Sequence, residues 1–145
     1  MPVLPHSERL PSGRRGFSVA FLRALLRFLT RHGAHEMEMA ELCKKPGLPV
    51  SVCRLTASTG LSLVESCVLL AEAESIDASS LFGLASTFFS YSWQGTQVCD
   101  MAAAAESGVT ELAAAPGGAA DRPRLLWLDM LCASQNLLAV RALPA

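Results

Sequence analysis

Two short apolar segments on either side of a helical segment limit the folds that this chain can adopt. Ser86–Ser90 carries two adjacent phenylalanines and Arg124–Asp129 is a continuous apolar run closed by an acid, so both predict buried strands. Between them, Val98–Leu112 is rich in Ala and favours a helix. Strand, helix and strand form a β-α-β unit, in which the two strands lie parallel. The sequence therefore predicts an α/β fold with a parallel sheet, preceded by N-terminal helices.

Polar residues follow both predicted strands, in Ser90–Gly95 and in Asp129–Asn136. In open parallel sheets, ligands bind beyond the carboxyl ends of the strands. We therefore expect the two segments to be neighbours in space. The residues expected to line a pocket there are Ser90, Ser92, Trp93 and Asp129.

Several of these side chains also have purely structural interpretations. Asp129 can bind a ribose hydroxyl or a cation, but taken alone it is more typical of a cap on the following turn. Trp93 can stack on a base, although a Trp after a buried strand is more often part of a core. Cys132 is interpreted as a buried, inert thiol.

The N-terminal part is predicted to contain a leader and helices. Residues 1–16 are rich in Pro and Gly and predict a flexible leader, and residues 17–49 a helical segment. Within the helix predicted at Phe17–His32, arginines recur every four residues and form a basic stripe. Such a helix can be an organelle presequence within residues 1–35 or touch a membrane surface, but an ordinary surface helix is the favoured interpretation.

Further elements are predicted from local signals. A short second helix is expected at Ala34–Lys45, and the capping box Ser62–Glu65 predicts a helix that ends near Glu74. Ile76–Gly83 is interpreted as a link, and Ala113–Pro123 as a surface loop.

Charge and cysteine content restrict the function classes. The net charge of −1 argues against nucleic acid as a partner. Five widely spaced cysteines suit free thiols in a reducing compartment, which predicts a cytoplasmic protein. No apolar run is long enough to span a membrane. Phosphate-binding glycine motifs and a paired metal-ligand spacing are also missing from the sequence.

The polar strand ends resemble a known family. Phe88–Trp93, followed by the segment from Leu126 to Asn136 that contains Trp127, Asp129 and Gln135, is similar to a TIR-like domain of the "S-x-W … W-x-D … Q" type in algae and other protists. It is also similar to the fungal heterokaryon-incompatibility (HET) domain. The resemblance covers about residues 50–137, within a region 50–145 that is predicted to be a truncated TIR-like α/β domain.

The resemblance implies a flavodoxin-like fold used for self-association in signalling and, in some members, for cleaving NAD. The catalytic glutamate of the TIR enzymes lies after the second strand, and no residue before Ala145 matches it. The first hypothesis is therefore a signalling or assembly module without catalysis, with no required cofactor, whose partners are copies of itself or other TIR-like domains. The alternatives are a nucleotide-binding or NAD-hydrolysing domain, with Trp93 on a base and Asp129 on ribose, and an inactive fragment of a larger protein.

Overall fold

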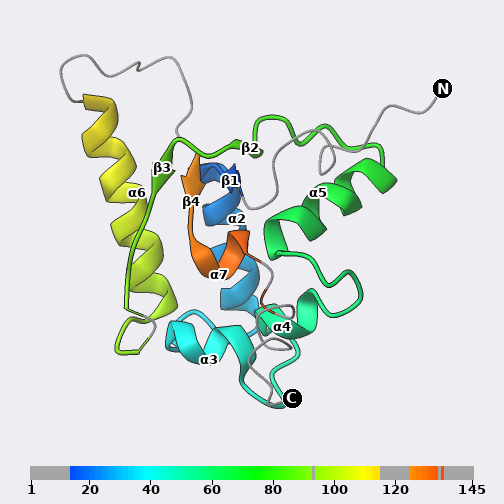
Figure 1. Ribbon diagram of the computed structural model, residues 1–145. Coiled ribbons are helices and arrows are strands. Elements are labelled where there is room, and N and C mark those ends of the chain that lie inside the picture. The colour runs from blue at the N-terminus through cyan, green and yellow to red at the C-terminus, as the bar shows by residue number, and fades with distance from the viewer. Residues whose placement is uncertain (1–13, 93, 115–124, 134, 136–145) are drawn as a thin grey trace, which may run out of the picture.

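Helices surround a small sheet in the computed structural model, which describes residues 14–92, 94–114, 125–133 and 135 (Figure 1). The predicted α/β class is confirmed. The elements in chain order are β1 (Arg15–Phe17), α2 (Val19–Arg31), α3 (Met39–Lys44), α4 (Val52–Leu55), α5 (Leu63–Ala73), β2 (Phe82–Leu84), β3 (Thr87–Phe88), α6 (Val98–Ala114), β4 (Leu126–Trp127) and α7 (Asp129–Cys132).

The sheet is mixed, with the strand order β2-β1-β4-β3. β3 and β4 pair in parallel, with Thr87 opposite Leu126 and Phe88 opposite Trp127, and α6 connects them. The predicted β-α-β unit is therefore confirmed. The prediction that the sheet is parallel is wrong beyond this pair, because β1 lies between β2 and β4 and runs antiparallel to both.

Strand β1 comes from residues that the sequence analysis assigned partly to a flexible leader. Arg15, Gly16 and Phe17 are all buried, although Arg15 and Gly16 fall within the predicted leader. A strand of three residues is too short to show a hydrophobic period, and its burial is imposed by the two strands beside it. Residues 1–13 lie outside the described residues. β2 likewise begins within Ile76–Gly83, which was interpreted as a link.

Strand β3 lies at the edge of the sheet and is not buried on both faces. Phe88 is 73% exposed, so the prediction of a buried strand at Ser86–Ser90 is wrong in this respect. β3 consists of Thr87 and Phe88 only, and the Phe88 ring contacts Trp127 of the neighbouring strand β4 while most of its surface stays exposed. Of the loop predicted at Ala113–Pro123, the first two residues belong to α6 and the others lie outside the described residues.

Serine residues are the N-caps of α2 and α5, the two helices that line the apolar groove described below. Ser18 Oγ accepts a hydrogen bond from the Phe21 N–H at 3.3 Å, and Ser62 Oγ accepts one from the Glu65 N–H at 3.0 Å. In a capping box the Glu65 side chain would also accept a hydrogen bond from the Ser62 N–H. Here the Glu65 carboxylate accepts one from Arg15 Nε of β1 instead. Helix α5 is thereby joined to the centre of the sheet.

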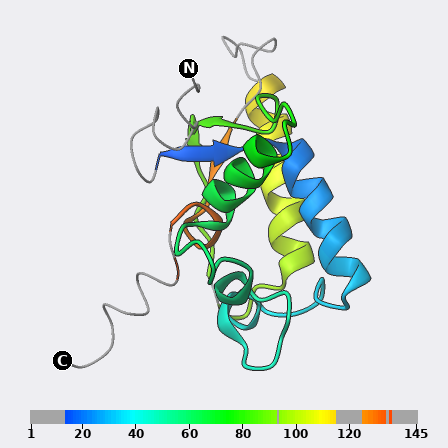
Figure 2. The same ribbon diagram turned by 90° about the vertical axis from the view of Figure 1, so that its right-hand side faces the viewer.

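Helix α2 is an integral part of the core. Phe21, Leu22 and Leu29 are buried, and Arg23 pairs with Glu106 of α6. Figure 2 shows α2 and α6 side by side along one side of the sheet. These contacts favour the interpretation of the basic stripe as the solvated face of an ordinary surface helix. No helix within the described ranges has the length and apolar character needed to cross a membrane.

Candidate functional site

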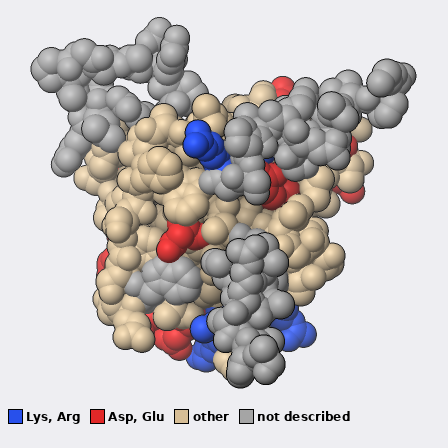
Figure 3. Space-filling model, viewed as in Figure 1, with Lys and Arg blue, Asp and Glu red and all other residues tan. Residues whose placement is uncertain are grey.

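A cleft of about 190 Å³ lies where β3 and β4 end. Its position confirms that the two polar segments are neighbours, as the β-α-β unit predicts. The face that carries β3 and β4 is largely uncharged, with a small acidic patch near its centre (Figure 3). The cleft is lined by four aromatic and two polar residues: Phe88, Phe89, Tyr91, Trp127, Ser90 and Asp129.

One hydrogen bond joins the two strand ends across this cleft. The Tyr91 hydroxyl donates to Asp129 Oδ1 at 3.2 Å, and the same oxygen accepts the Met130 N–H at 2.7 Å in the first turn of α7. The carboxylate thus lies in the first turn of α7, whose N-cap residue is Leu128 rather than Asp129. Burial, and then the negative charge of Asp129, raise the pKa of Tyr91 above its usual value. The tyrosine therefore remains a neutral hydrogen-bond donor.

Gln135, the last of the described residues, binds the backbone of the segment that follows β4. Its side-chain amide donates to the backbone oxygens of Asp129 and Ala133, at 3.0 Å and 3.1 Å. Its amide oxygen accepts the Cys43 thiol of α3 at an Sγ–O distance of 3.6 Å. Gln135 is only 6% exposed, so its buried amide depends on these hydrogen bonds in place of bonds to water. The same bonds hold α7 against α3.

The thiols near the cleft are held in their protonated form. Burial raises the pKa of Cys132 from 9.0 to about 12. Burial also raises the pKa of Cys43 to about 12, with a further contribution from the nearby Cys53. Because the thiolate is the reactive form, neither cysteine is activated as a nucleophile at neutral pH. This agrees with the interpretation of Cys132 as an inert thiol.

The four residues predicted to line the pocket have different positions. Ser90 and Asp129 line the cleft together. Ser92 is exposed and donates its hydroxyl to the Gln94 carbonyl oxygen at 2.7 Å, which makes it part of the turn. Trp93 lies outside the described residues. Aromatic side chains of the same two segments, among them Tyr91 and Trp127, form most of the lining and were not selected from the sequence.

The chemistry of the cleft is that of a binding site for a planar group. Its aromatic faces can pack against a flat ring, and the Asp129 carboxylate can accept a hydrogen bond from a hydroxyl or amine. Within the described ranges, no three His, Cys, Asp or Glu side chains are grouped closely enough to hold a metal ion.

A larger apolar groove of about 670 Å³ lies elsewhere, between α2, α4 and α5. Helices α2 and α5 each contribute residues at the same spacing of i, i+3, i+4 and i+7. In α2 these residues are Phe21, Ala24, Leu25 and Phe28. In α5 they are Leu63, Ser66, Cys67 and Leu70. This groove was not predicted from the sequence, although the repeated spacing is its sequence signal.

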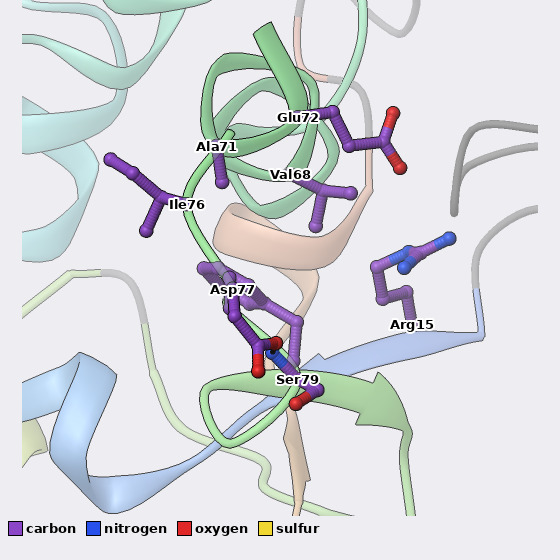
Figure 4. A pocket seen from close by; sticks show the side chains of 9 residues that line it. Arg15, Val68, Ala71, Glu72, Ile76, Asp77 and Ser79 are labelled. Atoms are coloured by element: carbon purple, nitrogen blue, oxygen red, sulfur yellow. Dashed lines mark hydrogen bonds between the residues drawn. The ribbon is translucent and has the colours of Figure 1, made fainter. Parts of the chain in front are cut away.

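A third, small cavity of about 60 Å³ lies beside a buried ion pair. Arg15 Nε donates to Glu65 Oε1 at 2.9 Å, and the two side chains are 3% and 15% exposed. Figure 4 shows Arg15 rising from β1 towards α5, on the same side as Glu72. Arg15 Nη2 and Glu65 Oε2 are buried and have no hydrogen-bond partner among the described residues. This pair links the sheet to α5 but leaves two polar atoms unsatisfied.

Comparison of the chain with family models, with curated proteins and with solved structures finds no match.

Proposed function

We propose that this chain is a TIR-like signalling or assembly module that acts by associating with copies of itself or with other TIR-like domains, without catalysis of its own. The observation that carries the proposal is the apolar groove between α2, α4 and α5. Leu70 at its edge is 63% exposed, in a protein whose other apolar residues largely form one core. Large apolar hollows on a protein surface are typical of interaction sites.

The parallel β3-α6-β4 unit and the polar residues at its strand ends support a TIR-like, flavodoxin-like relationship. In this proposal β1 and β2 are an antiparallel addition that covers the inner edge of β4. A cytoplasmic location is part of the same proposal, and it is supported by five cysteines that are all free thiols.

The protonation and hydrogen bonding of the groups in and beside the strand-end cleft support a role without catalysis. The pKa values of Tyr91 and Cys132 are raised, so both groups stay protonated at neutral pH. Asp129 Oδ1 already accepts two hydrogen bonds that hold the cleft together. The cluster is therefore built to join β3, β4 and α7 rather than to exchange protons with a substrate.

The proposal predicts reversible self-association of the wild-type chain. In light scattering, the average mass is expected to rise from monomer towards dimer between about 1 μM and 100 μM, the range of weak protein association. The rise should persist in high salt, because apolar burial is its main driving force. A mass that stays monomeric over this range, together with no binding to other TIR-like domains, contradicts the proposal.

The aromatic cleft favours a second candidate function, the binding or hydrolysis of a nucleotide such as NAD. A base would pack on the aromatic wall and Asp129 would accept a ribose hydroxyl. Incubation with NAD, followed by chromatography for nicotinamide and a fluorescence titration, tests this function. Asp129→Asn is the matched variant, since an amide oxygen keeps the acceptor for Tyr91 and Met130 while the charge is removed. No binding and no release by the wild type eliminates this candidate.

A further inference from the structure

We propose that the apolar groove binds the same groove of a second copy of this chain, in a symmetric dimer in which Glu74 of each copy faces Arg54 of the other. This inference rests on the proposed function and names its interface. It follows from the shape of the groove, from the charges at its two ends and from the symmetry that these charges require.

The shape follows from two apolar faces on each of the helices α2 and α5. One face of each helix is in the core, represented by Leu22 and Leu29 in α2 and by Val64 and Val68 in α5. The other faces line the groove. Core burial explains the first faces and also Phe21 and Leu63, the first groove residue of each helix. The later groove residues of both helices, from Ala24 to Phe28 and from Ser66 to Leu70, include exposed and half-buried side chains that no element in the described part of the chain covers fully.

Small residues of both helices lie in the middle of the groove. In α2 the small Ala24 lies between Phe21 and Phe28, and in α5 the small Ser66 lies between Leu63 and Leu70. Such a hollow accepts the apolar ridge of a helix, which is a common mode of helix recognition. Leu70 at the groove edge has 63% of its surface exposed and supplies apolar area that a second copy can cover.

Opposite charges mark the two ends of the groove. Arg54 is next to Leu55, which lines the end formed by α4. Glu74 follows Leu70 by four residues and ends α5 on the same helical face. Figure 2 shows α4 and the C-terminal end of α5 at opposite ends of this side of the molecule. Both residues are exposed, and neither forms an ion pair with another residue of the described ranges.

These charges favour a second copy as the occupant. A two-fold axis through the middle of the groove brings the basic end of one copy onto the acidic end of the other, and it does so twice. A partner with charge of one sign would meet attraction at one end and repulsion at the other. The surface is therefore complementary to itself in an antiparallel arrangement.

A charge-swap experiment tests this arrangement on exposed residues that do not support the fold. Glu74→Arg and Arg54→Glu each place like charges opposite one another at both ends, so each variant alone is expected to self-associate about tenfold more weakly than wild type. An equimolar mixture of the two variants restores both opposite-charge contacts in the heterodimer. We expect the mixture to associate as strongly as the wild type in sedimentation or light scattering.

A second pair of variants tests the apolar part of the interface. Leu70→Asp places a charge in the groove and is expected to give a monomer, whereas Leu84→Asp changes an equally large apolar residue, 55% exposed, on β2 outside the groove and is expected to leave association unchanged. Circular dichroism confirms that both variants are folded.

The outcomes separate the interface from the proposed function. If the wild type associates but the groove variants associate equally well, or the mixture fails to recover, the inferred interface is wrong and the assembly function stands. If the wild type stays monomeric at all concentrations, both self-association and this interface are wrong.

Discussion

A Gly16→Ala variant is expected to lose about 3 kcal/mol of its free energy of unfolding, since overfilling a packed site at the centre of a sheet has costs of this order. Gly16 occupies the middle of β1, between β2 and β4. A Cβ atom at this position would clash with the backbone oxygen of Leu126 and would lie 2.8 Å from the Cβ of Ala85. Backbone atoms of a paired strand cannot rotate away as a side chain does, so β1 must move. Urea denaturation followed by circular dichroism measures the loss.

Gly108 provides the matched control for this substitution. It lies within α6, and apart from the helix backbone and the two neighbours in the chain, a Cβ there would meet no heavy atom of the described residues within 4 Å. Gly108→Ala is expected to stabilise the protein by about 0.5 kcal/mol, because Ala has the higher helix propensity and reduces the freedom of the unfolded chain. The two variants add the same methyl group and should change stability in opposite directions. Equal, small effects at both positions would show that β1 does not occupy the crowded place described here.

The fold was predictable where local signals repeat and unpredictable where partners impose the structure. The apolar period of α2, the capping box that begins α5 at Ser62, and the Ala-rich α6 each carry their own local signal. β1 does not, because three residues show no period and their burial depends on β2 and β4. The mixed sheet order depends on β1 and on β2, neither of which was predicted as a strand.

The candidate site was predictable in position but not in composition. The carboxyl ends of β3 and β4 meet because the β-α-β unit requires it, and Ser90 and Asp129 line the cleft there. The wall also contains Tyr91 and Trp127, whose directions depend on the local backbone after each strand. The supporting bond from Cys43 to Gln135 joins residues far apart in the sequence and leaves no local pattern to detect.

The second large effect is expected at the buried ion pair between Arg15 and Glu65. Arg15→Met removes the guanidinium that bonds Glu65 Oε1 at 2.9 Å and leaves a carboxylate that is 15% exposed without its counter-charge. Breaking one side of a buried pair is expected to lower the free energy of unfolding by about 3 kcal/mol. Arg23→Met breaks an Arg–Glu pair between α2 and α6 that is 59% and 37% exposed, so it serves as the matched control and is expected to change stability little.

The double variant Arg15→Met/Glu65→Leu decides what the pair contributes. Arg15 Nη2 and Glu65 Oε2 are buried and lack partners within the described part of the chain, so burying the intact pair already has a desolvation cost that its one bond does not offset. Apolar side chains of similar volume remove that cost together with the bond, and the double variant is expected to lie within about 1 kcal/mol of wild type. The resulting coupling in a double-mutant cycle should then be about as large as the losses in the two single variants added together. Additive losses from the two substitutions would instead mean that each side chain is held by its own packing, and that β1 and α5 are not joined through this pair.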